Sequence, residues 1–149
     1  MTTLTELEVG ATHSVVLVEN LTRTRLVQYA VASGDYNPLH TDEPFAREIA
    51  GYPGVFAHGT LTMGMTARAL TDWVGEELIT RIGVRFTAQV WPGDTLTAVV
   101  TVTEVGDGRV GFDLTTTNQD GTVVLTGTAD CAAGAGGPRA AAVVSGAGI

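Results

Sequence analysis

The sequence contains no lysine, and its eight basic residues are all arginines. Chemistry that depends on lysine is therefore excluded, including Schiff-base formation, attachment of pyridoxal phosphate and the Walker phosphate loop. Acidic residues outnumber basic ones by 16 to 8, which gives a formal net charge of −8. Because a nucleic-acid-binding protein needs a basic surface, this charge argues against a nucleic-acid partner.

Cysteine is almost absent, and Cys131 stands alone. A single cysteine cannot form an internal disulfide, and without a Cys/His cluster we expect no structural zinc site. The sequence also lacks a run of about 18 apolar residues, so no membrane-spanning helix is predicted. The N-terminal stretch MTTLTELEVG has neither the basic nor the apolar region of a signal peptide. We therefore expect a cytoplasmic protein without a membrane partner.

What is present suits one domain, because 149 residues with 44% hydrophobic content can bury a substantial core. We expect this domain to occupy residues 1–133. The segment 134–149 is rich in glycine and alanine and has no periodicity. It is predicted to be a mobile tail, with docking on a partner as the alternative.

Hydrophobic periodicity predicts helices in the first half of the chain. A strand is expected within 8–18, followed by a helix that Thr22 or Thr24 caps and that ends at Ser33 and Gly34. A short helix is expected around Pro44 to Ile49. A long helix follows, because apolar residues recur at a spacing of four: Leu61, Met65, Ala69 and Trp73.

Alternating apolar residues predict strands in the second half, over 78–90, 95–105, 109–118 and 122–132. One long apolar helix packed on a curved antiparallel sheet would bury both, which predicts an α+β domain. Gly64 lies inside the long helix, where glycine costs about 1 kcal/mol relative to alanine. We therefore expect another part of the protein to pack closely against it.

The stretch SGDYNPLH, residues 33–40, places Asp35 and His40 around a break that Pro38 imposes on the helical pattern. Each residue alone is explained by a turn or a helix cap. Together they favour acid–base chemistry, because a carboxylate and an imidazole that meet on one water can exchange protons near neutral pH. A metal site completed by His58 is less favoured, since the spacing matches no known ligand motif.

A second stretch, Ala57 to Thr60, precedes the long helix. Gly59 there either permits a sharp turn or lets a ligand approach the free amides of the helix start, where negative charge is favoured. Beside the loop of Asp35 and His40, an oxyanion site is the better interpretation.

These stretches resemble one known family. The run YAVASGDYNPLH, residues 29–40, resembles the hydratase-2 motif of the MaoC-like hot-dog-fold dehydratases and (R)-specific enoyl-thioester hydratases. The same resemblance extends to HGTLTMG (58–64), WVG (73–75) and VRFTA (84–88), and covers about residues 9–132. Within the family, the sequence most resembles the catalytic subunit of mycobacterial (3R)-hydroxyacyl-ACP dehydratase. Ala32 departs from the motif, which has Val, Leu, Ile or Gly there.

The resemblance implies a single hot-dog fold and a hydro-lyase that interconverts (3R)-hydroxyacyl and trans-2-enoyl thioesters on coenzyme A or acyl carrier protein. No cofactor and no metal are implied beyond that carrier. Asp35 and His40 would hold and activate the water, and the Gly59 amide would receive the oxyanion. The residues expected to support this loop are Ser33, Asn37, Pro38 and His58. Those expected to contact the substrate are Tyr36, Thr60, Met63 and Arg85. A homodimer, or a heterodimer with a related hot-dog subunit, is also implied.

Two alternatives remain open at this stage. A hot-dog thioesterase would bind the same thioesters and release the free thiol. The SGDYNPLH loop speaks against it, because this loop is typical of the hydratases among hot-dog-fold proteins. A non-catalytic acyl-binding subunit would need neither Asp35 nor His40. A nucleophilic role for Cys131 is the least favoured, because its place in an alternating strand suggests a small buried residue.

Overall fold

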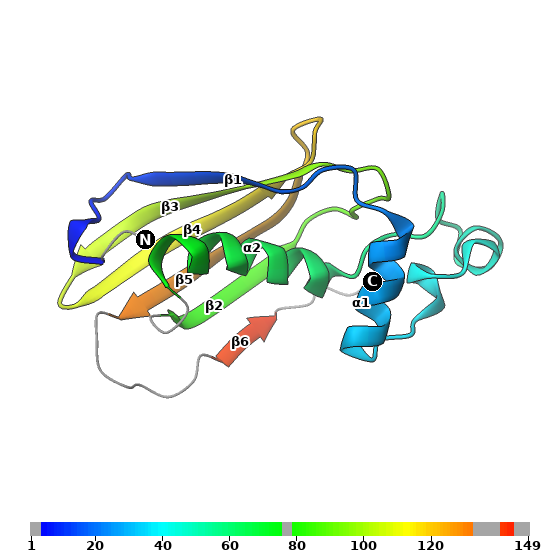
Figure 1. The fold of residues 1–149 in the computed structure, drawn as a ribbon, viewed down its shortest axis with the longest axis horizontal. Coiled ribbons are helices and arrows are strands. Elements are labelled where there is room, and N and C mark those ends of the chain that lie inside the picture. The colour runs from blue at the N-terminus through cyan, green and yellow to red at the C-terminus, as the bar shows by residue number, and fades with distance from the viewer. Residues whose placement is uncertain (1–3, 76–78, 133–140, 145–149) are drawn as a thin grey trace.

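The computed structural model describes residues 4–75, 79–132 and 141–144. These residues form one six-stranded sheet in the order β1-β3-β4-β5-β2-β6 (Figure 1). All neighbouring strands are antiparallel except β2 and β6, which run parallel. The strands are β1 (Thr12–Val18), β2 (Ile79–Phe86), β3 (Leu96–Gly106), β4 (Arg109–Thr117), β5 (Val123–Ala132) and β6 (Ala141–Val144).

The long helix α2 (Gly59–Val74) lies across one face of this sheet (Figure 1). Its buried residues are Thr62, Thr66, Ala69, Leu70 and Val74, which recur at helical spacing on a single side. Inward-facing residues of the strands meet them, and in β3 these alternate as Leu96, Ala98, Val100 and Val102. One core between one helix and one sheet confirms the predicted α+β domain.

Gly127 lies where two strands of the sheet approach each other too closely for a side chain. A Cβ added to Gly127 of β5 would lie 2.4 Å from the carbonyl oxygen of Gly83 in β2. Because backbone atoms cannot move aside cheaply, only glycine fits there. The sheet therefore depends on this residue where β2 and β5 pair.

The segment between β1 and α2 stands at one end of the sheet and contains α1 (Arg23–Ser33) (Figure 1). The Thr22 hydroxyl accepts a hydrogen bond from the amide of Arg25, so Thr22 is the cap of the two that were predicted. Gly34 ends α1 with a φ of 74°, a left-handed conformation that favours glycine.

Two local predictions in this segment need correction. The loop predicted over 35–40 contains a 3₁₀ turn at Pro38–His40, because Asn37 caps it with its side chain and proline suits a first turn. The short helix expected near Pro44 to Ile49 is a π-helical turn at Phe45–Ile49. Periodicity detects such turns poorly, because they are too short to show a repeat.

Three further differences concern the helix, a strand end and the tail. Gly64 has no atom within 4 Å of an added Cβ among the described residues, so the predicted close packing there is wrong. The strand expected over 78–90 ends at Phe86, and residue 78 lies outside the described residues. Within the predicted mobile tail, Ala141–Val144 pairs with Arg81 to Val84 as β6, while 133–140 and 145–149 are not described.

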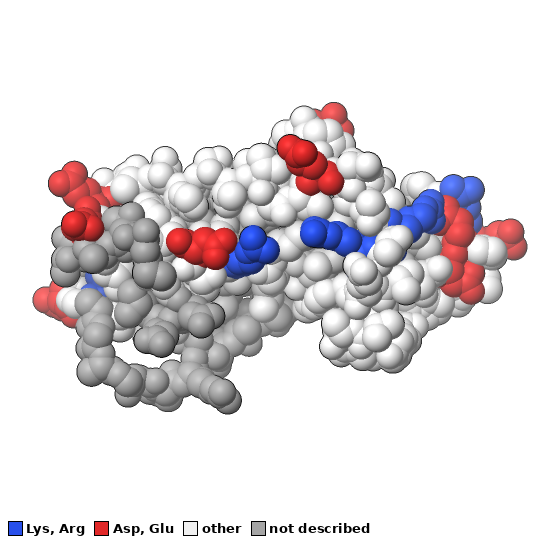
Figure 2. Space-filling model, in the orientation of Figure 1, with Lys and Arg blue, Asp and Glu red and all other residues white. Residues whose placement is uncertain are grey.

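Charged side chains are sparse on the face drawn in Figure 2, where acidic and basic groups lie in small mixed clusters separated by uncharged surface. No helix among the described residues is long and apolar enough to cross a membrane. The expected cytoplasmic location stays a prediction.

Candidate active site

A cavity of about 350 Å³ lies where the SGDYNPLH loop, the start of α2 and the segment after β2 meet. Its lining combines apolar side chains with a few polar groups, as is typical of small-molecule sites. The lining residues are Asn37, Leu39, His40, Tyr52, Phe56, Ala57, Gly59, Thr62, Phe86, Thr87, Ala88, Gln89, Val90 and Val124.

The loop at 33–39 is held by a series of short-range hydrogen bonds. The Ser33 hydroxyl accepts from the amide of Asp35 at 3.2 Å, and Asp35 Oδ1 accepts from the amide of Asn37 at 3.2 Å. Asn37 Oδ1 in turn accepts from the amide of Leu39 at 3.1 Å. These bonds satisfy the backbone locally, as Asp and Asn side chains do in turns. One oxygen of Asp35 thus braces the loop, while the side chain remains 52% exposed.

His40 is buried at the end of this loop, and its Nδ1 lies 2.6 Å from the carbonyl oxygen of Phe56. A carbonyl can only accept, so Nδ1 carries the hydrogen and Nε2 has the lone pair. Burial lowers the pKa of His40 below its usual value, the nearby His58 ring lowers it further, and the Phe56 hydrogen bond and Asp35 act in the opposite direction. His40 is therefore a neutral imidazole with a basic Nε2 at neutral pH.

His58 connects the loop to the helix. Its Nε2 donates to the carbonyl oxygen of Asp35 at 3.0 Å and lies 3.8 Å from Asp35 Oδ2. Its ring stacks on that of His40, with centroids 3.7 Å apart, and Tyr29 covers it from α1 at 5.0 Å. His58, which the sequence analysis expected to support the SGDYNPLH loop, thus contacts both candidate catalytic residues.

The N-terminus of α2 faces the same cavity. Gly59 is the first residue of the helix, so its N–H has no intrahelical acceptor, and the helix dipole favours negative charge there. An added Cβ at Gly59 would lie 2.9 Å from the ring of Phe86. Glycine is therefore required for the helix start and this ring to share the cavity wall.

Ion pairs hold the segment between α1 and α2, which contributes Tyr52 and Phe56 to the cavity lining. Glu43 pairs with Arg23 at the start of α1 and with Arg47 at 2.8 Å, and Arg47 Nε donates to the carbonyl of Pro53 at 2.9 Å. The hydrogen bond from Arg23 is the main cause that lowers the pKa of Glu43. Glu43 thus pairs with two arginines, Arg23 and Arg47.

Among the described residues, one group could hold a metal ion. Asp35, His40 and His58 each offer a ligand atom, and these atoms lie within 4.8 Å of one another. His58 Nε2 donates its hydrogen to the carbonyl oxygen of Asp35, and His40 Nδ1 donates its hydrogen to the carbonyl oxygen of Phe56. If His58 Nε2 bound a metal ion, its hydrogen bond to Asp35 would be lost. The expectation of no metal stays a prediction.

The structure brings most of the predicted site residues together. Asp35, His40 and His58 lie close together, and His40, Asn37 and Gly59 line the cavity. Ser33 braces the loop, and Pro38 begins its 3₁₀ turn. Their catalytic and supporting roles remain predictions.

The four residues expected to contact substrate do not line this cavity: Tyr36, Thr60, Met63 and Arg85. Tyr36 is 67% exposed, and Met63 packs against the core. Arg85 points to the outer face of the sheet, because its neighbour Val84 points inward toward α2.

Several lining residues were missed by the sequence analysis. Thr62 follows Gly59 by three residues, so helical spacing could have identified it. Phe86 and the residues 87–90 directly follow the VRF stretch, but their approach to the helix start is a tertiary contact. Val124 comes from β5, and no local signal in the sequence points to it.

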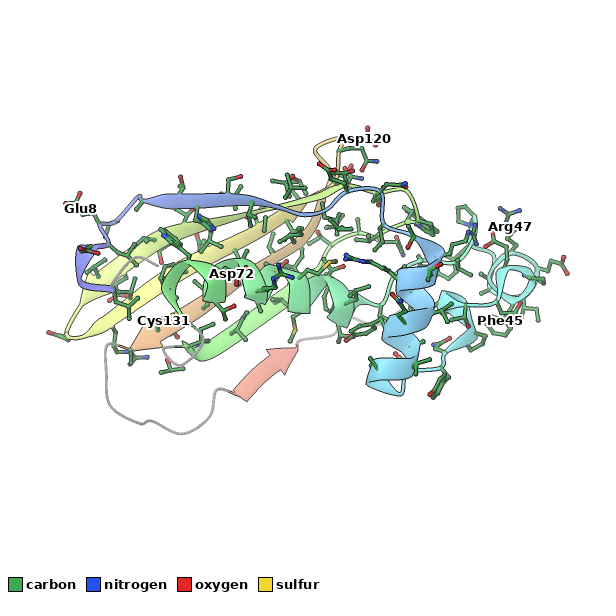
Figure 3. All side chains as sticks on the ribbon, in the orientation of Figure 1. Glu8, Phe45, Arg47, Asp72, Asp120 and Cys131 are labelled. Carbon is green, nitrogen blue, oxygen red and sulfur yellow. The ribbon has the colours of Figure 1, made fainter. Side chains whose placement is uncertain are left out.

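Cys131 plays no part in this cavity. It is fully buried in β5, and burial, followed by the charge of Asp130, raises its pKa to about 12. Figure 3 shows it at the opposite end of the molecule from Phe45 and Arg47. A thiol that stays protonated and buried is not a nucleophile.

A long helix on a curved antiparallel sheet, with an Asp/His pair beside the helix N-terminus, defines a hot-dog-fold protein. The chain belongs to the MaoC-like domain family, whose model matches residues 6–124. This membership confirms the family inferred from the sequence.

Two relatives from Mycobacterium tuberculosis show the sequence similarity. One is 3-hydroxyacyl-thioester dehydratase Y, 44% identical over 92 residues that cover 60% of this chain and 31% of the relative. The other is the enoyl-CoA hydratase ChsH3, 39% identical over 98 residues that cover 63% of this chain and 32% of the relative. The chain thus spans about a third of the length of each, as the shares of 31% and 32% show.

Solved structures show the same fold. The R-hydratase PhaJ1 from Pseudomonas aeruginosa matches with a TM-score of 0.77 and 28% identity, over 87% of this chain and 84% of that one. A chain of the ChsH1-ChsH2 complex from M. tuberculosis matches with a TM-score of 0.75 and 27% identity, over 85% of this chain and 98% of that one. The predicted hot-dog fold is thereby confirmed.

Proposed function

We propose that the chain is a hydro-lyase that adds water to trans-2-enoyl thioesters and removes it from (3R)-hydroxyacyl thioesters carried on coenzyme A or acyl carrier protein. The relatives are named as dehydratases and hydratases. The observation that carries the proposal is that His40 and the start of α2 line one cavity, while a carboxylate oxygen of Asp35 lies within 4.8 Å of a ring nitrogen of His40.

The proposed reaction uses these groups as follows. A water held between the Asp35 carboxylate and His40 Nε2 forms the C3–O bond, and one of its protons passes to this pair. A proton from the pair reaches C2, so the substrate gains one water and nothing else. Negative charge that develops on the thioester oxygen is received by the N–H of Gly59. Dehydration follows the same steps in reverse.

The environment of His40 supports its part in this chemistry. A lowered pKa keeps the imidazole neutral and able to accept a proton at pH 7. The hydrogen bond to Phe56 fixes the tautomer whose Nε2 is basic. Asp35 keeps one side exposed, which leaves it accessible to water.

The partner is proposed to be a second hot-dog subunit, either a copy of this chain or a related one. Val27 and Val31 lie on α1 with 48% and 62% exposure, and Tyr36 beside the site is 67% exposed. A group of exposed apolar side chains next to a site often marks a contact surface. Light scattering of the purified chain tests this, and a monomer at micromolar concentration contradicts the homodimer.

The reaction is tested with crotonyl-CoA by following the conjugated enoyl absorbance together with free thiol. We expect the absorbance to fall without release of thiol. Asp35→Asn and His40→Gln are expected to lower kcat by about 10²–10⁴ with the fold intact. Asp72→Asn and His13→Gln serve as matched controls, because Asp72 pairs with Arg68 and His13 stacks on Trp73, away from the cavity lining.

Each other outcome identifies an alternative. Thiol release would assign the chain to the thioesterases. No reaction with crotonyl-CoA or with longer enoyl thioesters would contradict the proposal for the isolated chain and favour a non-catalytic acyl-binding subunit. Near-native rates in both variants would remove Asp35 and His40 from the mechanism.

A further inference from the structure

His58 occupies a position that simple packing does not explain. Its side chain is 1% exposed and sits at the N-cap of α2, yet it makes no capping hydrogen bond to the helix. Its Nδ1 has no hydrogen-bond partner among the residues that the structure describes. A buried imidazole with one nitrogen unsatisfied costs free energy, so the other contacts of the ring have to offset that cost.

Those other contacts are with the two candidate catalytic residues. The carbonyl of Asp35 can only accept, so Nε2 of His58 carries the hydrogen and donates it at 3.0 Å. This bond anchors the backbone from which the Asp35 carboxylate projects. On its face, the same ring stacks on His40 at 3.7 Å with the planes 27° apart. His58 itself is not among the residues that line the cavity.

We propose that His58 is a positioning residue that holds the Asp35 carboxylate and the His40 imidazole in working geometry, by one hydrogen bond and one ring stack. The inference rests on the proposed function, because it concerns how the same site is arranged. His58 acts through its two neighbours and touches neither the substrate nor the water.

The stack also controls the surroundings of His40. The titratable groups in contact with the His40–His58 pair are Asp35 from the loop and Tyr29 from α1. Tyr52, from the segment before α2, lines the same cavity as His40. Burial is the main cause that lowers the pKa of His40, and His58 adds to it. Removing the ring at position 58 exposes one face of His40, so the pKa of His40 moves up toward 6.5.

Two substitutions separate the hydrogen bond from the stack. His58→Phe keeps a ring against His40 and removes the donor to Asp35. His58→Gln keeps an amide donor near the position of Nε2 and removes the ring. His13→Phe and His13→Gln are the controls, because His13 also stacks on an aromatic ring, that of Trp73 at 5.3 Å.

In the hydration assay, we expect His58→Phe to lower kcat by about 10²-fold, because a misplaced catalytic group costs about that much. Its KM should stay within about twofold, since the residue does not touch substrate. The acid limb of its pH profile should move less than that of His58→Gln, because Phe keeps His40 buried and removes only the charge effect of His58. His58→Gln should lose less in kcat, and its acid limb should shift to higher pH. The His13 variants should match the wild type in all three measurements.

Wild-type kcat and an unchanged pH profile in both His58 variants would overturn the inference. A second measurement covers the case in which the variants do not fold. Long-range ¹H–¹⁵N correlation spectra of the wild type should show the hydrogen on Nε2 of His58 and on Nδ1 of His40, and a hydrogen on Nδ1 of His58 would also overturn it. An inactive wild type is a failure of the proposed function, whereas active wild type with unaffected variants is a failure of this inference alone.

Discussion

The imidazole of His40 donates through Nδ1 to the backbone carbonyl of Phe56 across 2.6 Å. This bond comes from the residue two positions before His58 in the chain, so the segment that starts α2 also orients the candidate base. The loop of Asp35 and the start of α2 are thus joined at His40. Substitutions in either segment should therefore alter the orientation of the His40 imidazole.

The first prediction concerns pH. The pKa of His40 is lowered from 6.5, mainly by burial, so the folded protein binds this proton less readily than the unfolded chain. The contribution of His40 to the free energy of unfolding is therefore full above pH 6.5 and falls as the pH drops below it. Urea unfolding between pH 5 and 8 should show this loss, and His40→Gln should reduce it.

The kcat/KM profile should have its acid limb below pH 6.5; a limb above that value contradicts the buried, neutral His40.

The second prediction concerns the glycine at the helix start. In Gly59→Ala, the new methyl group meets the ring of Phe86 at 2.9 Å, and the ring must move within the cavity wall. We expect kcat/KM to fall about tenfold or more, because the oxyanion donor and the cavity shift together. The control is Gly64→Ala on the same helix, where nothing lies within 4 Å. That variant should keep its activity and gain about 0.5–1 kcal/mol in the free energy of unfolding.

A third prediction uses two threonines one helical turn apart. Within the described part of the chain, Thr62 Oγ1 is buried without a hydrogen-bond partner, whereas the hydroxyl of Thr66 bonds that of Thr116 at 2.7 Å. Thr62→Val should raise the free energy of unfolding by about 1 kcal/mol, and Thr66→Val should lower it by about 1–3 kcal/mol by leaving the Thr116 hydroxyl unpaired. Denaturant unfolding checks both. Destabilisation by Thr62→Val would show that its hydroxyl has a partner in solution.

The fourth prediction tests the close pairing of β2 and β5. Gly127→Ala places a methyl group 2.4 Å from the carbonyl oxygen of Gly83 and should cost about 1–3 kcal/mol or more. Gly111→Ala in β4 is the comparison, because its nearest neighbour is the hydroxyl of Thr103 at 3.3 Å, which can rotate away. Thermal unfolding should therefore separate the two variants, and equal melting temperatures would contradict a rigid contact at Gly127.

Much of the site could be predicted because its residues are close together in the chain. Asp35 and His40 share one loop, and Pro38 and Gly34 mark that loop by their backbone preferences. The substrate-contact residues were chosen by closeness in sequence to these motifs, and they are not among the residues that line the cavity. Arg85 shows why: strand alternation sends it to the outer face of the sheet while the next residue, Phe86, lines the cavity.

The sequence by itself determined the α+β class, the helix and strand order, and the family, because periodicity and short motifs are local properties of the chain. The tertiary structure alone decided which residues close the cavity, such as Val124 from β5, and that His58 bonds Asp35 and stacks on His40. It also decided the pairing of Ala141–Val144 with β2. These are contacts between segments far apart in the chain, which depend on how the sheet curves around α2 and leave no periodic trace in the sequence.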